Sequence, residues 1–457
     1  MKTNTIISAG VMAWTIFLVN SLSAQTVSEK YIRNWNDPEI KERIEHGIET
    51  HRKDWAEIRF VNQEGEEIPF TGEISIQQKS HDFLFGASIF MLDEYEDPAQ
   101  NETYEQVFKD LLNFATVPLY WKTLEPERGR LRYGKESSHI FRRPPPDRVV
   151  EFCNNHGVVM KGHPLFWDNP GFAIPAWWPS EEDSMTMLLE QRIRGISNRY
   201  GQDIQYWDVV NETNNRHVEV PAPQDFPLLT FELADKYLGK VHSLAYNFTT
   251  RIWRDYAEEY SLEYLLIDNL MLKGGRVDAI GLQFHLMGRG IWNGVLQGKS
   301  FTPKDLYRTM DLYGRFGIPL QITEVTFPAL PEGRTGEDNQ GRITRDFYRL
   351  WFSHPNVEAI TWWNVADGGA AKRQNRWRGG FLDENLDPKP AYHVLNELIN
   401  EEWTTEMENS LQEQSSFRFK GFHGTYEVVL SRQNQIMQKK IIHLDAAREN
   451  RFTLMLP

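Results

Sequence analysis

The sequence contains a single cysteine, Cys153, among its 457 residues. One cysteine cannot form an intrachain disulfide, and none stands just behind the N-terminal apolar segment, where it could carry a lipid. Stability must therefore come from a hydrophobic core, and a hydrophobic content of 40% is enough for a large one.

An excess of basic residues is also missing. Lys and Arg together number 50 against 64 Asp and Glu, which gives a formal net charge of -14. Binding to nucleic acid or to an anionic membrane surface usually requires a basic face. The charge balance therefore argues against both kinds of partner.

The motifs of nucleotide and metal enzymes are absent as well. No glycine-rich phosphate loop follows any expected strand, which argues against a nucleotide-binding enzyme. His163, Asp168, His285 and Glu324 are chemically possible metal ligands, but no H-E-x-x-H or Cys/His spacing supports a metal site. We expect neither a metal nor an organic cofactor.

Only one extended apolar run could interact with a membrane, and it lies near the N-terminus. Lys2 precedes the apolar residues 6–19, and Ser21, Leu22 and Ser23 follow in a small-x-small pattern. The run is shorter than the ~20 residues of a membrane span. It predicts a signal peptide over residues 1–24 rather than a membrane anchor, and hence a protein exported to the periplasm or the medium. We also expect the protein to be a monomer.

Residues 25–82 and 413–457 share a pattern that differs from that of the chain between them. Residues 40–54 predict a charged helix, and Ala56, Ile58 and Phe60 then alternate with polar residues. The C-terminal part contains three strand-like runs separated by polar turns. Since neither part can bury a core alone, we expect them to pair into one β-sandwich, with a carbohydrate-binding or a purely structural role.

The central residues 83–402 alternate short apolar runs with longer amphipathic ones, which predicts a (β/α)8 TIM barrel. The expected strands are residues 83–90, 114–119, 158–167, 206–212, 264–269, 279–285, 320–325 and 359–365. Only nine residues separate the fifth run from the sixth, too few for a crossover helix. Either the fifth helix is missing or one strand is misassigned, and we expect the first.

Polar side chains stand at the ends of these strands, where a parallel barrel places its active site. A single one would more often cap a helix or bind a loop carbonyl, but clusters from six strands would meet at one rim. They are His163 and Asp168, Asn211 and Glu212, Asp268 and Asn269, Gln283 and His285, Glu324, and Trp362, Trp363, Asn364 and Asp367.

Two glutamates among amides, histidines and tryptophans suit glycoside hydrolysis. One carboxylic acid protonates the leaving oxygen, and one carboxylate attacks or activates water. Tryptophan faces stack on sugar rings, while amide and imidazole groups bind hydroxyls. The expected partner is therefore a polysaccharide or oligosaccharide.

Seven segments in chain order resemble glycoside hydrolase family 10, best known for endo-1,4-β-xylanases. They are "LEPERGRLRY", "KGHPLFW", "WDVVNE", "DAIGLQFHL", "ITEV", "ITWWNVAD" and "FLDENLDPKPAY". The likeness extends from about Phe83 to Tyr392. It implies a (β/α)8 barrel and a retaining mechanism on a β-linked glycan.

The resemblance also implies a role for each strand-end residue. Glu212 would be the acid/base and Glu324 the nucleophile, with the pKa of the acid raised above that of its partner. The remaining roles concern the sugar at the cleavage point: Asn211 would hold its 2-hydroxyl, His163 would contact it, Trp363 would form part of its floor, and Gln283 and His285 would bond to the nucleophile.

The sequence departs from the family on one side of the expected site. The Glu, Asn and Lys that usually precede the tryptophan aligned with Trp121 are replaced by residues 116–120, which are mainly apolar, and Asp168 stands where a histidine is common. Lys122 lies two positions beyond the usual lysine. The substrate is therefore open: xylan, a differently decorated xylan, another β-linked glycan, or an exo-acting enzyme's chain end.

The insertion "SSHIFRRPPPDRVV" adds a stiff rim between the second and third strands. Its Arg142 and Arg143 could meet an acidic sugar, although two surface cations on a solvated loop are the more common case. Two further interpretations remain for the whole chain: a sugar-binding protein on a barrel that has lost catalysis, and a structural component of the cell surface.

Overall fold

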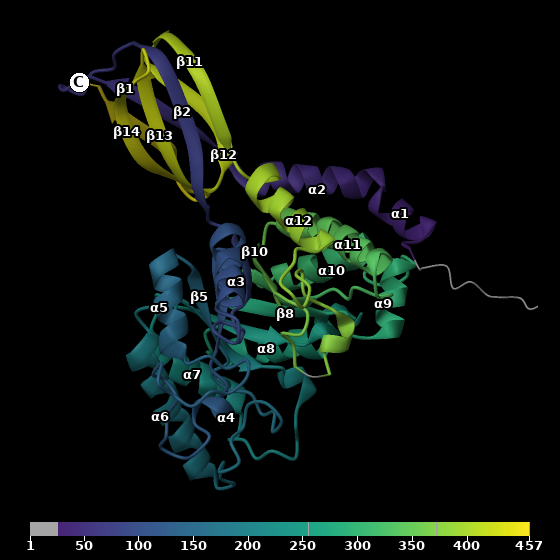
Figure 1. The fold of residues 1–457 in the computed structure, drawn as a ribbon. Helices are drawn as coiled ribbons and strands as arrows, with labels where there is room; N and C mark the ends of the chain where they lie inside the picture. Colours follow the sequence, from purple (N-terminus) through teal and green to yellow (C-terminus); the bar gives the residue numbers. More distant parts are fainter. Residues whose placement is uncertain (1–25, 255, 372, 457) are drawn as a thin grey trace, which may run out of the picture.

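The computed structural model describes residues 26–254, 256–371 and 373–456, so the predicted signal peptide at 1–24 lies outside the described residues. Eight parallel strands close into a barrel, and two smaller sheets form a second body beside it (Figure 1). The expected (β/α)8 barrel with an accessory β unit is confirmed.

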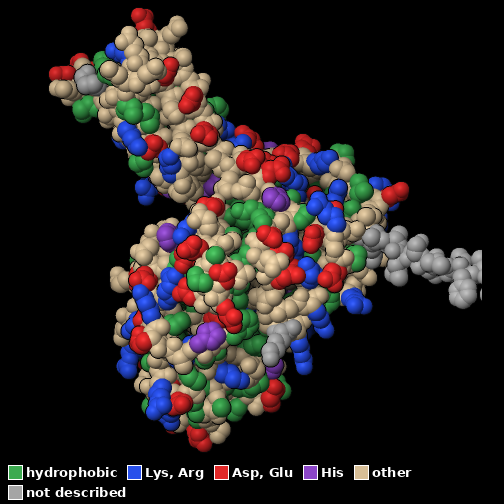
Figure 2. Space-filling model, in the orientation of Figure 1, with side chains coloured by type: hydrophobic (Ala, Val, Ile, Leu, Met, Phe, Trp, Pro, Cys, Tyr) green, Lys and Arg blue, Asp and Glu red, His purple; other side chains and the backbone are tan. Residues whose placement is uncertain are grey.

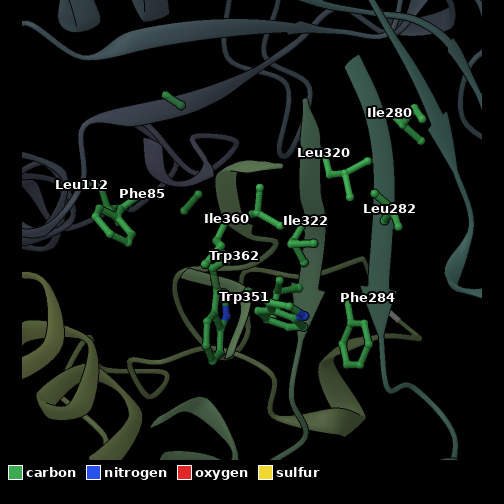
Figure 3. Packing of buried hydrophobic residues seen from close by; sticks show 14 of the residues in the cluster. Phe85, Leu112, Ile280, Leu282, Phe284, Leu320, Ile322, Trp351, Ile360 and Trp362 are labelled. Carbon is green, nitrogen blue, oxygen red and sulfur yellow. The ribbon is translucent and has the colours of Figure 1, made fainter. Parts of the chain in front are cut away.

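The barrel strands follow one another in the order β10-β3-β4-β5-β6-β7-β8-β9. The outer faces of the strands are apolar, as packing against helices requires, whereas the barrel interior also holds buried polar side chains: Lys161 Nζ on β5 donates across the barrel to Gln321 Oε1 on β9 over 3.1 Å. Figure 3 shows Ile280 and Leu282 of β8 beside Leu320 and Ile322 of β9. The bounds are β3 Leu84–Ser88, β4 Phe114–Pro118, β5 Val159–His163, β6 Tyr206–Asn211, β7 Ser243–Phe248, β8 Ala279–His285, β9 Leu320–Thr326 and β10 Val357–Trp362.

Helices cover the barrel and connect its strands. None of the described helices is long and apolar enough to cross a membrane. The helices are α1 Glu29–Trp35, α2 Pro38–His51, α3 Pro98–Leu111, α4 Trp121–Leu124, α5 Pro146–His156, α6 Glu182–Tyr200, α7 Phe226–Leu238, α8 Leu262–Leu272, α9 Arg289–Leu296, α10 Pro303–Gly314, α11 Arg334–Ser353 and α12 Pro390–Asn396.

The fifth predicted strand is wrong. Residues 264–269 belong to helix α8, and the fifth barrel strand is β7, which precedes it. The run that contains them is apolar on nearly all sides, so its periodicity could not separate a helix from a buried strand. Because α8 connects β7 to β8, no crossover helix is missing there, and Asp268 and Asn269 lie on a helix instead of a strand end.

The accessory unit is a sandwich of two sheets that combine both ends of the chain. One sheet has the order β12-β1-β15 and the other β11-β2-β13-β14. Within them Ile58 pairs with Phe417, and Ile76 with Val428. The three strand-like runs expected near the C-terminus are β13, β14 and β15, and two further strands, β11 and β12, precede them. The bounds are β1 Lys53–Val61, β2 Phe70–His81, β11 Glu406–Gln414, β12 Ser416–Phe422, β13 Gly424–Arg432, β14 Gln435–Leu444 and β15 Asn450–Met455.

The sandwich sits at the amino end of the barrel strands. Strand β2 leads directly into the start of β3, and the Arg52 guanidinium donates to the carbonyl oxygen of Val357, at the start of β10, over 2.7 Å. Trp403 stacks on Phe352 with ring centroids 4.0 Å apart. Figure 2 shows the sandwich projecting from the barrel. The carboxyl ends of the strands therefore remain free of it.

We expect the sandwich to be stabilised by its own buried cluster. Leu430 on β13 is fully buried, so Leu430→Ala should lower the free energy of unfolding by about 2–5 kcal/mol. Ile441→Ala on the neighbouring strand β14 is the control, because this side chain is 55% exposed and should change stability by less than about 0.5 kcal/mol. Chemical denaturation of both variants measures the difference. Equal losses would show that the sandwich has no independent core.

Candidate active site

The carboxyl ends of the barrel strands bring the two glutamates to one amide group. Gln283 on β8 donates from Nε2 to Glu324 Oε1 over 2.9 Å and to Glu212 Oε1 over 3.2 Å. Glu324 belongs to β9, and Glu212 follows β6 directly. Residues from three strands, far apart in the sequence, thus form one paired-carboxylate centre.

Both glutamates have a backbone conformation that is uncommon for a residue with a side chain. The φ angles are 55° at Glu212 and 56° at Glu324, in the left-handed region. The pairing of β9 shifts register beside Glu324 against both β8 and β10. Such strain and bulges are concentrated at functional sites, where they turn a side chain toward its task.

Glu324 is buried and surrounded by hydrogen-bonding groups. Besides Gln283, Asn247 Nδ2 donates to Oε1 over 3.1 Å, and His285 Nε2 lies 3.1 Å from Oε2. His285 Nδ1 lies 2.9 Å from the hydroxyl of Thr326. Burial lowers the pKa of His285 to about 4, so at neutral pH the ring is uncharged. A proton on Nε2 then makes it a donor to Glu324, and Nδ1 accepts from Thr326.

Asn247 is a site residue that the sequence analysis missed, because β7 was not recognised as a strand. The signal was the short apolar run "SLAYNF", in which this asparagine is the second-to-last residue. Its Oδ1 accepts from the Thr323 hydroxyl over 2.7 Å, and its Nδ2 also donates to Asn211 Oδ1 over 2.8 Å. These bonds fix the amide orientation of Asn247, and they leave Asn211 Nδ2 as a donor for a ligand.

Burial changes the acidity of both glutamates. It raises the pKa of Glu212 to about 7, and the neighbouring Glu324 carboxylate adds to the rise. It also raises the pKa of Glu324 to about 7, although the nearby His163 and Lys161 charges and the Asn247 hydrogen bond oppose the rise. The expected difference between the two is not seen in these values. Glu324 has the larger set of donors, which favours it as the group that ionises first.

His163 at the end of β5 is held by a buried acid. Its Nδ1 lies 2.8 Å from Asp208 Oδ2, and Lys161 Nζ lies 3.0 Å from the other carboxylate oxygen. Although burial raises the pKa of Asp208, the Lys161 charge and the hydrogen bond from His163 lower it overall. Asp208 therefore fixes the His163 ring and leaves its Nε2 for a ligand.

Aromatic rings form one wall beside the glutamates. The Trp363 ring lies 5.6 Å from His163 and 6.0 Å from His285, centroid to centroid. Phe90 and Tyr120 extend this wall, with Phe90 5.1 Å from Trp363 and Tyr120 5.3 Å from His163. An apolar ring surface beside polar donors suits a sugar, which has hydrophobic faces and a hydroxyl rim.

The other strand-end residues do structural work. Asp168 accepts from Arg216 Nε over 2.6 Å, and Asp367 forms a buried ion pair with Lys389 at 3.1 Å. Trp362 is buried in the barrel core (Figure 3). Lys122 donates to the Pro170 carbonyl over 2.8 Å, so it ties down a loop.

No three His, Cys, Asp or Glu side chains in the described parts of the chain are grouped so that they could hold a metal ion.

The site brings together all seven residues that the sequence singled out for catalysis and binding, which are Glu212, Glu324, His163, Asn211, Gln283, His285 and Trp363.

Comparison with known proteins agrees with this architecture. The chain is 27% identical over 323 residues to endo-1,4-beta-xylanase B of Thermotoga neapolitana, covering 66% of this chain and 84% of the relative. It is 24% identical to the anti-sigma-I factor RsgI6 of Acetivibrio thermocellus, over 84% of this chain and 46% of that protein.

Solved structures show the same barrel. Xylanase 10B from Thermotoga petrophila, in complex with xylobiose, superimposes with a TM-score of 0.57 at 22% identity, over 70% of this chain and 95% of the other. The sequence model for glycosyl hydrolase family 10 matches residues 75–398, which is well over half of the sequence. The chain belongs to glycosyl hydrolase family 10.

Proposed function

We propose that the protein is an exported retaining glycoside hydrolase that cleaves β-linkages in xylan or a related glycan. The shared amide of Gln283 carries the proposal. Its two hydrogen bonds keep the Oε1 atoms of Glu212 and Glu324 within roughly 6 Å of each other, whereas inverting enzymes hold their carboxyl groups about 6.5–9.5 Å apart and retaining enzymes about 5–5.5 Å.

The surroundings of the two carboxyl groups support a different role for each. Glu324 has donors on both oxygens, which stabilise an anion, so it attacks the anomeric carbon and forms the glycosyl-enzyme. Glu212 is partly exposed and its pKa is raised to about 7, so it delivers a proton to the leaving glycosidic oxygen. It then takes a proton from the water that releases the sugar.

The groups around the pair hold the sugar at the cleavage point. Asn211 Nδ2 and His163 Nε2 are left as hydrogen-bonding groups by the contacts that fix the rest of each side chain. Trp363 supplies an apolar face between His163 and His285. Because these side chains are positioned by buried neighbours, little freedom is lost when a sugar binds.

Xylan is the first substrate to test, since the relative from Thermotoga neapolitana and the solved structure from Thermotoga petrophila named above are xylanases. The buried apolar strand β4, with residues 114–118, supplies no hydrogen-bonding side chain of the family's usual kind. This change affects binding on one side of the site and leaves the carboxylate pair intact. It supports family 10 chemistry with an altered preference among xylan-like chains.

Removing either carboxylate should lower turnover strongly, but by a different amount and for a different reason in each case. Glu324→Gln should lower kcat on xylo-oligosaccharides by about 10⁴-fold or more, because no covalent intermediate can form. Glu212→Ala should lower it by about 10²–10⁴-fold, because the leaving oxygen is not protonated. Initial rates measure both effects. For the unaltered enzyme, NMR of the product should show the β anomer first.

Glu332→Gln is the control, because this carboxylate lies on the surface after β9 with a side chain 77% exposed. Undiminished turnover by Glu324→Gln would exclude Glu324 as the nucleophile. An α product would exclude retention. Binding of xylo-oligosaccharides without hydrolysis by the unaltered enzyme would favour the sugar-binding interpretation.

Burial of Glu324 should make stability depend on pH. Its pKa is raised from 4.5 to about 7 in the folded state. The protonated carboxyl therefore makes its full contribution to folding stability below pH 4.5, and this contribution is lost as the pH rises through 7. Glu324→Gln cannot ionise there, so its Tm relative to the unaltered protein should rise between pH 5 and pH 8. Thermal unfolding at the two pH values measures this, with Glu332→Gln as reference. A Tm difference that does not depend on pH would contradict a raised pKa of the buried Glu324 carboxyl.

Export predicts a shortened chain. The protein recovered from the periplasm or medium of an expressing bacterium should begin at Ala24 or Gln25, since cleavage is expected after Ser23 or Ala24. N-terminal sequencing of the fractions identifies the start. A chain that retains Met1 in the membrane fraction would show that the segment is an anchor.

A further inference from the structure

The segment 134–146, between β4 and α5, brings two arginines to the edge of the site. Arg142 is only 6% exposed and has φ 61°, in the left-handed region. Its Nη2 donates to Asn364 Oδ1 over 2.8 Å, on the residue after Trp363. The alternative favoured from the sequence, two cations on a solvated loop, is therefore wrong for Arg142 and does not describe the half-buried Arg143.

Neither arginine has a carboxylate partner among the described residues. Arg143 Nη1 donates to the carbonyl of Arg142 over 2.7 Å, while the Nε atoms of both side chains are buried without a hydrogen bond. The acid that acts on both, Glu94, is bonded to His139 at 3.0 Å. Burial lowers the pKa of Arg142 to about 10, so it is still charged at neutral pH.

Two neighbouring buried charges of the same sign are costly unless an anion completes them. Surface arginines would avoid the cost by reaching water, and structural arginines normally pair with an acid, as Arg148 pairs with Asp93 and Glu105 in this protein. Arg142 does neither, and Arg143 has no acid and reaches water only in part. This arrangement suits a binding site in which the anion is supplied by a ligand.

The two guanidinium groups lie against the aromatic wall of the catalytic site. Arg143 stacks on Tyr120 at 3.9 Å from the ring centroid, and both arginines lie over Phe90, at 5.5 Å for Arg142 and 5.3 Å for Arg143. The same two rings contact His163 and Trp363. An anion bound there would be part of the glycan that occupies the site, on the side of β3, β4 and β10.

We propose that Arg142 and Arg143 bind the carboxylate of a uronic acid carried by the glycan, next to the sugar held by His163 and Trp363. A guanidinium presents a planar pair of donors that matches a carboxylate, and the stacked Arg143 is already oriented. This inference rests on the proposed function, and it names the decoration by which the enzyme selects its substrate.

The test compares two xylo-oligosaccharides of equal length, one neutral and one carrying a glucuronic acid branch. The unaltered enzyme should show a kcat/KM about tenfold or more higher on the acidic substrate, because a charged hydrogen bond that is made only there adds to binding. Arg143→Gln should abolish this preference, mainly through KM, and leave the rate on the neutral substrate within about twofold.

Arg130→Gln is the matched control, because Arg130 lies nearby in the sequence with a side chain 78% exposed, and it should keep the preference. If Arg143→Gln does not fold, Arg143→Lys keeps the charge but not the planar pair, and should retain only part of the preference. Equal kcat/KM of the unaltered enzyme on both substrates would overturn the proposal. An equal loss of kcat/KM on the acidic and the neutral substrate in Arg143→Gln would also overturn it, because Arg143 would then only hold the Tyr120 ring in place.

Failure of the proposed function gives a different result. In that case neither substrate is hydrolysed, and binding to Glu324→Gln, measured by calorimetry, still distinguishes the acidic from the neutral oligosaccharide. Tighter binding of the acidic one, lost in the Arg143→Gln double variant, would support the arginine site on its own. Equal binding of both would overturn it.

Discussion

The site depends on one shared amide. Gln283 Nε2 donates to the carboxyl groups of Glu212 and Glu324, the proposed catalytic pair, so two hydrogen bonds from a single atom limit their separation. Two buried carboxyl groups this close cannot easily both be ionised, because each disfavours the charge of the other. The asymmetry that chemistry requires must then come from the surroundings. Asn247 and His285 provide it because their side chains bond to the carboxyl group of Glu324 and not to that of Glu212.

The rest of the barrel serves this asymmetry. Strands β7, β8 and β9 are adjacent, and each supplies a residue that contacts Glu324 or shapes its position. The register shift in β9 and the left-handed backbone at both glutamates are strained features that only a tightly packed barrel can hold. The sandwich anchors the opposite end of the strands, through Arg52 and Trp403, and leaves the rim open.

The sequence predicts those parts in which local pattern and tertiary role agree. Seven of the eight barrel strands are apolar runs that the sequence reveals, and five of these runs lead into the polar residues that include the glutamate pair. Helix α8, which follows strand β7, is apolar along most of its length, so the pattern favoured the wrong segment and hid Asn247. The burial of Arg142 was out of reach, because its side chain bonds to Asn364, which lies 222 residues further along the chain.

The two charged groups of the rim are best understood together. The centre holds two acids whose burial disfavours their anionic forms, and the wall beside it holds two buried cations without an acid of their own. If the cations existed to neutralise the glutamates, they would contact them, yet no ion pair among the described residues joins them, and the Tyr120 ring lies against both Arg143 and His163. Without such ion pairs, a cation can attract an acidic glycan while the two glutamates keep the raised pKa values that proton transfer near neutral pH requires. Binding charge and reacting charge are thus held by different parts of the rim.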